Sequence, residues 1–163
     1  MKKKLIALIS FLCYIICWVQ AADEHYYFKN LSIQDGLSQT TVNAIMQDKK
    51  GFMWFGTKGG LNRYDGMSFR NFKHDTTDNH SLGNNFVTCL YQDNNGNIWV
   101  GTDAGVYIYY SDQEIFIPFD RLSRENTKIE RTVSAISGDK QGRVWIAVET
   151  QGLFCYEPQK DRL

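Results

Sequence analysis

The sequence predicts an all-β fold built from one unit that is written three times. Three tryptophans, Trp54, Trp99 and Trp145, are spaced 45 and 46 residues apart. Aspartates and glycines recur in step with them, at Asp48, Asp93, Asp139, Gly51, Gly96 and Gly142. After residue 21 no stretch shows sustained helical periodicity. A period of about 40 to 50 residues is typical of solenoids, propellers or arrays.

The local pattern within one unit predicts four short strands. In the first copy, residues 41–48 and 52–57 are rich in β-forming side chains and flank an Asp-x-x-Gly turn, in which glycine supplies a positive φ. Residues 60–65 and 67–74 predict a third and a fourth strand. Four antiparallel strands with one tryptophan and several glycines are typical of a propeller blade.

We therefore predict a partial β-propeller of about three four-stranded antiparallel blades, preceded by a signal peptide. Blade one is expected at about 33–75, blade two at about 84–120 and blade three at about 131–163. One such sheet buries a face only by lying on its neighbour, so the copies should stabilise one another. The three tryptophans recur mid-strand and are predicted to fill the space between blades rather than to hold a ligand.

Residues 1–21 have the layout of a secretory signal peptide. Three lysines precede an apolar run at 5–19, and cleavage is expected after Ala21. An uncleaved membrane anchor is the alternative. Removal of residues 1–21 from the 163 leaves 142 residues with 15 basic and 18 acidic side chains, a net charge of −3. That charge offers no basic stripe for nucleic acid.

Cys89 and Cys155 are the cysteines that would remain after cleavage. They occupy different positions in different copies, so we predict two separate, mostly buried thiols rather than a disulfide. Cys89 matches Ala44 and Ala135 on the first strand of the other copies, where it would act as a small packing residue.

Catalytic, cofactor and metal sites are not predicted, and this chain is not expected to be an enzyme. His25, His74 and His80 lack metal-ligand spacing. The segment 93–97 resembles a calcium loop only superficially, because its glycine is at position four and Ala104 stands where an EF-hand has glutamate. We read it as a turn.

A ligand-facing surface is predicted at one end of the blades. Strands alternate in direction, so the loop between strands two and three lies at the same end as the links between blades. That end collects Lys58, Asp103, Arg131 and Glu149, together with the polar segments 76–85 and 121–130. Polar, varied loops on a rigid scaffold are where binding usually occurs. The prediction concerns the surface as a whole, because any single residue of it is more often part of an ordinary solvated loop.

The repeated unit Val-x-x-Ile-x-x-Asp-x-x-Gly-x-x-Trp-x-Gly-Thr-x-x-Gly-Leu-x-x-Tyr resembles the two-component regulator propeller repeat. The opening stretch, residues 26–66, is similar to the start of the sensor region in hybrid two-component systems of Bacteroides-type bacteria. Copy three departs from the pattern, since Ala147 replaces the glycine after the tryptophan and the threonine is lost.

This resemblance implies a periplasmic sensor that is anchored in the inner membrane and responds to carbohydrates, with an oligosaccharide as ligand. Its histidine kinase, receiver and DNA-binding parts would lie outside this chain. The partners would then be the remaining blades and the membrane-kinase part of the same protein, and a homodimer is left open. Residues 26–32 would form a lone strand that closes the ring with a missing last blade.

Two other functions stay open from the sequence. The chain could be a stand-alone exported propeller module that assembles with itself. It could also be a piece of an exported propeller lyase or hydrolase, which would need a histidine or acidic cluster near the axis. We favour an amino-terminal fragment of a longer sensor, because no capping end is visible in the repeats.

Overall fold

The computed structural model describes residues 26–122 and 128–157. Two compact units are distinguished, residues 1–30 and residues 31–163. Of the first unit only residues 26–30 are described, and they are coil. The predicted signal peptide at 1–21 lies outside the described residues. No helix in the described ranges has the length and apolar character needed to cross a membrane.

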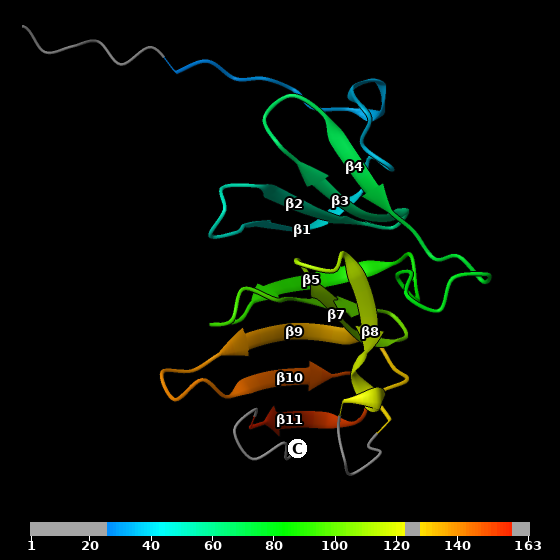
Figure 1. Cartoon of the computed structure of the whole chain (residues 1–163), viewed down its shortest axis with the longest axis vertical. Coiled ribbons are helices and arrows are strands. Elements are labelled where there is room, and N and C mark those ends of the chain that lie inside the picture. Colours follow the sequence, from blue (N-terminus) through cyan, green and yellow to red (C-terminus); the bar gives the residue numbers. More distant parts are fainter. Residues whose placement is uncertain (1–25, 123–127, 158–163) are drawn as a thin grey trace, which may run out of the picture. The chain divides into compact units, whose positions relative to one another are not determined.

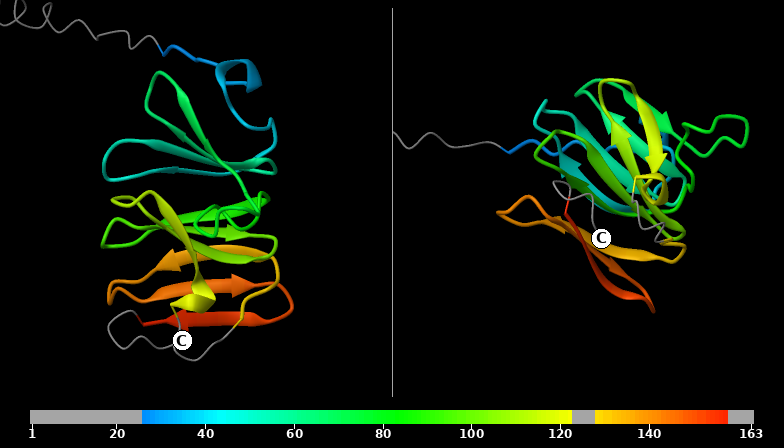
Figure 2. Two further views of the ribbon diagram at one scale, coloured as in Figure 1. Left: turned by 45° about the vertical axis from the view of Figure 1, so that its right-hand side comes forward. Right: turned by 60° about the horizontal axis from the view of Figure 1, so that its bottom comes forward.

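The second unit contains three antiparallel sheets, which confirms the all-β prediction (Figures 1 and 2). Sheet one consists of β1 (Val42–Gln47), β2 (Met53–Thr57), β3 (Gly60–Tyr64) and β4 (Phe69–Phe72). Sheet two consists of β5 (Val87–Gln92), β6 (Ile98–Thr102), β7 (Gly105–Tyr110) and β8 (Ile115–Pro118). Sheet three consists of β9 (Val133–Gly138), β10 (Val144–Val148) and β11 (Gly152–Tyr156). Its described part therefore has three of the four expected strands.

The strand expected at residues 26–32 is not formed, since no strand of the described residues pairs with this segment. These residues are coil, and the chain then turns into a short 3-10 helix, η1 (Ile33–Asp35). Ser32 and Asp35 form a capping box: the Ser32 hydroxyl accepts from the Gln34 N–H at 3.2 Å, and Asp35 accepts from the Ser32 N–H at 2.8 Å. The cap begins η1 at Ser32, which is also where the predicted strand was to end.

The aspartate of each repeat joins the turn to the tryptophan. Asp48 Oδ1 accepts from the Lys50 and Phe52 N–H groups, both at 2.9 Å, while Oδ2 accepts from Trp54 Nε1 at 2.8 Å. Asp93 and Asp139 make the same three bonds in their own copies, with indole distances of 3.1 and 3.0 Å. The sequence predicted the turn but not the bond to the indole, which explains why aspartate and tryptophan keep a spacing of six.

Two of the three tryptophans pack between neighbouring sheets, as predicted, whereas Trp145 of sheet three is half-buried and meets no further sheet among the described residues. Trp54 of sheet one is 1% exposed and meets Tyr109 of sheet two edge-on, with ring centroids 5.2 Å apart. Trp99 of sheet two lies 5.6 Å from Tyr156 of sheet three. Each pair is part of a separate apolar cluster, one between sheets one and two and one between sheets two and three.

Sheet two is covered on both faces, and its strands divide their side chains between the two neighbours. Ile98 and Val100 belong to the cluster shared with sheet one, whereas Trp99 belongs to the cluster shared with sheet three. This alternation follows from the two-residue period of a strand. All five residues of β6 are buried as a result.

The glycine of the Trp-x-Gly motif lets the next sheet approach. A Cβ on Gly56 would lie 2.5 Å from Val87 Cγ1 of sheet two. A Cβ on Gly101 would lie 2.4 Å from Cys89 Sγ and 3.0 Å from Val133 Cγ1 of sheet three. Both contacts are too short for a real side chain, so the inner strands stack only because these positions carry no methyl group.

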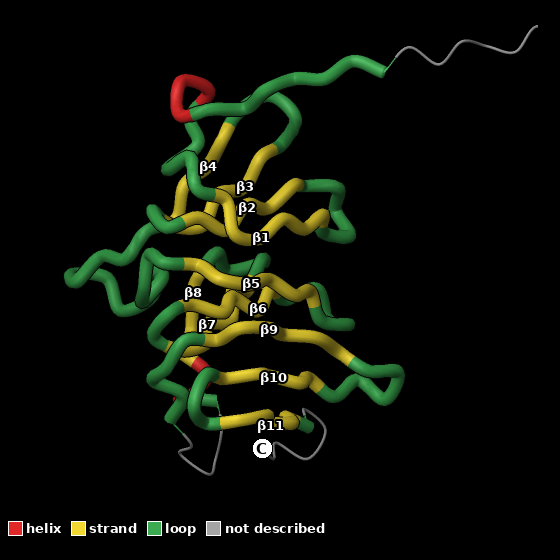
Figure 3. The backbone as a smooth tube through the Cα atoms, turned by 180° about the vertical axis from the view of Figure 1, so that it is seen from behind, coloured by secondary structure: helices red, strands yellow, loops and turns green. Residues whose placement is uncertain are grey.

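The inner strands β1, β5 and β9 follow one another in the stack (Figure 3). Hydrogen bonds connect them at an irregular position in each strand. Asn43 Nδ2 donates to the Val87 carbonyl at 2.8 Å, and Thr88 Oγ1 donates to the Val133 carbonyl. Cys89 beside this contact is a free thiol, and so is Cys155, which confirms the prediction of two separate cysteines.

Replacing Gly101 by alanine should destabilise the chain by about 1–3 kcal/mol, because the added methyl overlaps Cys89 Sγ. Urea unfolding measures the change. Adding Cys89→Ala, the residue found in the other two copies, should recover part of the loss in a double-mutant cycle. Equal losses in the single and double variants would show that the clash is not the cause.

Acid should weaken the third repeat through Asp139. Its pKa is lowered from 3.8 to about 2, first because Trp145 donates to it and then because Arg143 does. A carboxyl with a lowered pKa stabilises the folded state above its ordinary pKa and loses that effect as pH falls through the folded value. The urea midpoint of the wild type should therefore fall more than that of Asp139→Asn between about pH 4 and pH 2. Parallel curves would contradict this.

Candidate functional site

The predicted ligand-facing residues lie at one end of the three sheets. Lys58, Asp103 and Glu149 directly follow β2, β6 and β10, and Arg131 precedes β9. The register places these positions together, because the end of each second strand pairs with the start of its first strand, as in Val87↔Thr102. All four side chains are exposed. The opposite end carries the Asp-x-x-Gly turns (Figure 1, left).

A buried threonine shapes the loops of this end in copies one and two. Thr57 Oγ1 donates to the Gly60 carbonyl at 2.8 Å and accepts from the Gly59 N–H at 3.0 Å. Thr102 makes the equivalent bonds in copy two. Copy three lacks the threonine and has one more residue in its loop, where Thr150 adopts a φ of 62°. A β-branched residue in this region is strained, so the copy-three loop differs in backbone as well as sequence.

Three of the four predicted residues make different contacts. The Lys58 ammonium lies 5.2 Å from the centre of the Phe86 ring in a cation–π contact. The Asp103 N–H donates to the Phe86 carbonyl at 3.1 Å, and the Glu149 N–H donates to the Thr132 carbonyl at 2.9 Å. None of the four lines the pocket described next, so their role in binding stays a prediction.

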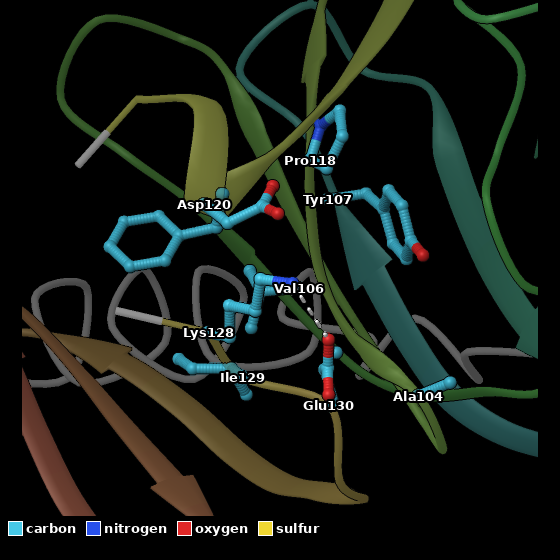
Figure 4. Close-up of a pocket in the computed structure, with 10 residues that line it drawn as sticks. Ala104, Val106, Tyr107, Pro118, Asp120, Lys128, Ile129 and Glu130 are labelled. Atoms are coloured by element: carbon cyan, nitrogen blue, oxygen red, sulfur yellow. Dashed lines mark ion pairs between the residues drawn. The ribbon is translucent and has the colours of Figure 1, made fainter. Parts of the chain in front are cut away.

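A pocket of about 240 Å³ opens at the same end of sheet two, between the β6–β7 turn and the segment that leads into β9 (Figure 4). We call it the blade-two pocket. It is lined by Ala104, Gly105, Val106, Tyr107, Pro118, Phe119, Asp120, Lys128, Ile129 and Glu130.

Packing of the short helix η2 (Phe119–Arg121) fixes one wall. Phe119 is 2% exposed and contacts Trp99 and Tyr156, at centroid distances of 5.6 and 5.2 Å. Its burial between sheets two and three holds the next residue, Asp120, at the pocket. On the other wall, Gly105 has a φ of 119°, and a Cβ there would meet the Ile129 carbonyl oxygen at 2.4 Å. The absence of a side chain at Gly105 therefore lets the β6–β7 turn lie against the segment that leads into β9.

The polar groups of the pocket are mostly acceptors. Asp120 Oδ1 is buried and has no hydrogen-bond partner among the described residues. At the rim, Lys128 Nζ and Glu130 Oε1 form an ion pair at 3.6 Å, with both side chains largely exposed. The pKa of Tyr107 is raised by burial, and further by the charges of Asp120 and Asp103, so its hydroxyl stays protonated.

The sequence predicted that the four candidate ligand-facing residues lie at one end of the blades, but it did not predict the pocket. The predicted segment 121–130 contributes Lys128, Ile129 and Glu130, while residues 123–127 lie outside the described ranges. Asp120 and Tyr107 were missed because they have no marked position in the repeat. One feature of the sequence could have indicated Asp120: it is an acidic residue that comes directly after Pro118 and Phe119, at the end of an expected outer strand.

The described histidines have ordinary structural surroundings. His74 Nδ1 lies 3.2 Å from the Leu82 carbonyl oxygen, and His80 lies beside Asp78. Across residues 26–122 and 128–157, no group of three or more histidine, cysteine, aspartate or glutamate side chains could hold a metal ion.

Two segments of the chain, residues 36–59 and 81–104, match the two component regulator propeller family. Each match ends with the loop after β2 or β6. Histidine kinase P4 of Formosa agariphila is 38% identical to this chain over 77 residues, which are 47% of this chain and 5% of that protein.

Solved structures with the same arrangement include two extracellular domains from B. thetaiotaomicron. That of the hybrid two component system BT3049 has a TM-score of 0.73 and 28% identity, covering 82% of this chain and 19% of that one. That of the one component system BT4673 has a TM-score of 0.60 and 23% identity, over 74% of this chain and 17% of that one, and shows the fold alone. This chain thus spans a small part of the proteins that it matches.

Proposed function

We propose that this chain, which carries two-component regulator propeller repeats, is part of the extracellular propeller of a hybrid two-component sensor. This propeller binds the ligand that the sensor detects. The observation that carries this proposal is the match to the extracellular domain of BT3049, which extends over 82% of this chain at 28% identity. The similarity to histidine kinase P4 points to the same class of protein.

The ligand is a carbohydrate, and it binds at the end of the blades where the β2–β3, β6–β7 and β10–β11 loops meet the links between blades. Support comes from the arrangement of that end. At that end the β10–β11 loop is one residue longer than the equivalent loops and has a different backbone, and the blade-two pocket opens beside the β6–β7 loop. The Asp-x-x-Gly turns at the opposite end keep the same three aspartate bonds in every copy. Binding sites lie on variable loops that a rigid scaffold holds in place.

The chain works in the periplasm, as the exported part of a protein anchored in the inner membrane. Binding here biases a kinase that lies elsewhere in the protein, and phosphoryl transfer and DNA binding belong to those other parts. The partners of this region are the neighbouring blades and the membrane-kinase part of the same protein. Pairing of two copies of the sensor is one way in which the signal crosses the membrane.

Replacing Lys58, Asp103 and Arg131 together by alanine in the full-length sensor should weaken oligosaccharide binding at least severalfold without unfolding the propeller. The three side chains are exposed at the ligand end, so their loss removes hydrogen-bonding groups and little packing. Calorimetric titration with a panel of neutral and acidic oligosaccharides measures the change.

A matched control replaces Lys50, Asp112 and Lys140 by alanine. These residues carry the same balance of charges and are also exposed, but they lie at the opposite end, in or near the turns. The control should bind as the wild type does. Unaltered binding in the first variant, or equal weakening in both variants, would show that the ligand does not bind at the predicted end.

A further inference from the structure

The blade-two pocket contains a buried carboxylate oxygen to which no described residue donates. Asp120 Oδ1 has no donor among the described residues, although buried polar atoms are nearly always hydrogen-bonded. Leaving a charged acceptor unpaired in this way is unfavourable, and the effect is largest for ionised groups. Because almost no surface of Oδ1 is accessible, a ligand in the pocket would reach the carboxylate through its other oxygen, and a donor there would compensate the charge that the described residues leave unpaired.

The remaining groups of the pocket favour a donor as well. Glu130 adds a second carboxylate, and the Ile129 carbonyl oxygen comes close to Gly105 at the wall. Lys128 supplies the ammonium among the lining side chains, and Glu130 already pairs with it at 3.6 Å. Two carboxylates and one ammonium give the lining a net charge of −1. An anionic ligand would therefore meet repulsion from Asp120 at short range.

The size and walls of the pocket limit the ligand further. Its volume of about 240 Å³ is below the range of about 300–1,000 Å³ that is usual for drug-sized ligands, so it suits a small molecule or one ring of a larger one. Val106, Pro118 and Ile129 provide apolar surface against which C–H groups can pack. Figure 4 shows the Asp120 carboxylate on the pocket side of η2, with Lys128 and Glu130 across from it.

We infer that Asp120 anchors a small ligand in the blade-two pocket by accepting hydrogen bonds from it, and that the pocket takes neutral or cationic ligands and rejects anionic ones. This inference rests on the proposed sensor function and adds the site, the anchoring residue and the charge of the ligand. The ligand presents hydroxyl or ammonium donors to Asp120 and an apolar face to the opposite wall.

The test uses three probes that share one sugar ring and differ in charge: D-glucose, D-glucosamine and D-glucuronate. Binding to the full chain is measured by saturation-transfer NMR and titration. Glucosamine and glucose should bind, and glucuronate should bind at least about tenfold more weakly than glucosamine, as expected for one charge-assisted hydrogen bond replaced by repulsion. Equal or tighter binding of glucuronate would overturn the inference.

The variant Asp120→Asn separates an anchoring role from a structural one. It should weaken glucosamine binding about tenfold and reduce the preference for glucosamine over glucuronate, because the charge is lost while the shape is kept. Its melting temperature should equal or exceed that of the wild type, since no described residue donates to Asp120 Oδ1 and the change therefore removes no hydrogen bond. A lower melting temperature with unchanged affinities would assign Asp120 a structural role and overturn the inference.

The matched control is Asp112→Asn, the same change at an aspartate that is 98% exposed and lies in the β7–β8 turn. It should alter neither the affinities nor the melting temperature. If no probe binds the wild type, the inference fails. The proposed sensor function would then still stand or fall by the oligosaccharide panel on the full-length protein.

Discussion

The structure depends on how closely one sheet can lie on the next. At each of the two interfaces, an inner-strand valine of the following sheet packs against a glycine two residues after the tryptophan, where a methyl group would overlap it. The tryptophan beside that glycine is held by the turn aspartate and covers the neighbouring tyrosine. The repeated residues thus serve one purpose, which is to bring two sheets into contact and keep water out.

The close approach of the sheets also determines which residues can vary between copies and which cannot. Residues that face a neighbouring sheet are fixed by packing, and the Asp-x-x-Gly turns are fixed by the aspartate bonds. The loops at the other end carry fewer such demands, so they can differ between copies, as the longer and strained loop around Thr150 does. Asp120 lies at the boundary between scaffold and loops. Its neighbour Phe119 is buried between two sheets, while its own carboxylate lines the pocket.

Repetition made most of the fold predictable from the sequence. Spacing placed the turns, the second strands and the tryptophans, and a small residue at the position of Cys89 followed from Ala44 and Ala135. The bond from each aspartate to its indole was missed, because a turn alone accounts for Asp-x-x-Gly. The strand expected at 26–32 is not formed, because a single extended segment gains no ladder hydrogen bonds without a partner strand, and none pairs with it among the described residues. The pocket was missed because residues 118–120 and 128–130, which form one side of it, belong to links that do not repeat.

Amide hydrogen exchange along equivalent second strands tests most directly the claim that the sheets stabilise one another. Strand β6 is covered on both faces and fully buried, whereas β2 and β10 each alternate between buried and half-buried residues for part of their length. The account predicts the slowest exchange in β6, and faster exchange in both β2 and β10 despite their nearly identical hydrogen-bond registers. Equal protection in all three strands would mean that each sheet is stable by itself, and the central role of the interfaces would be contradicted.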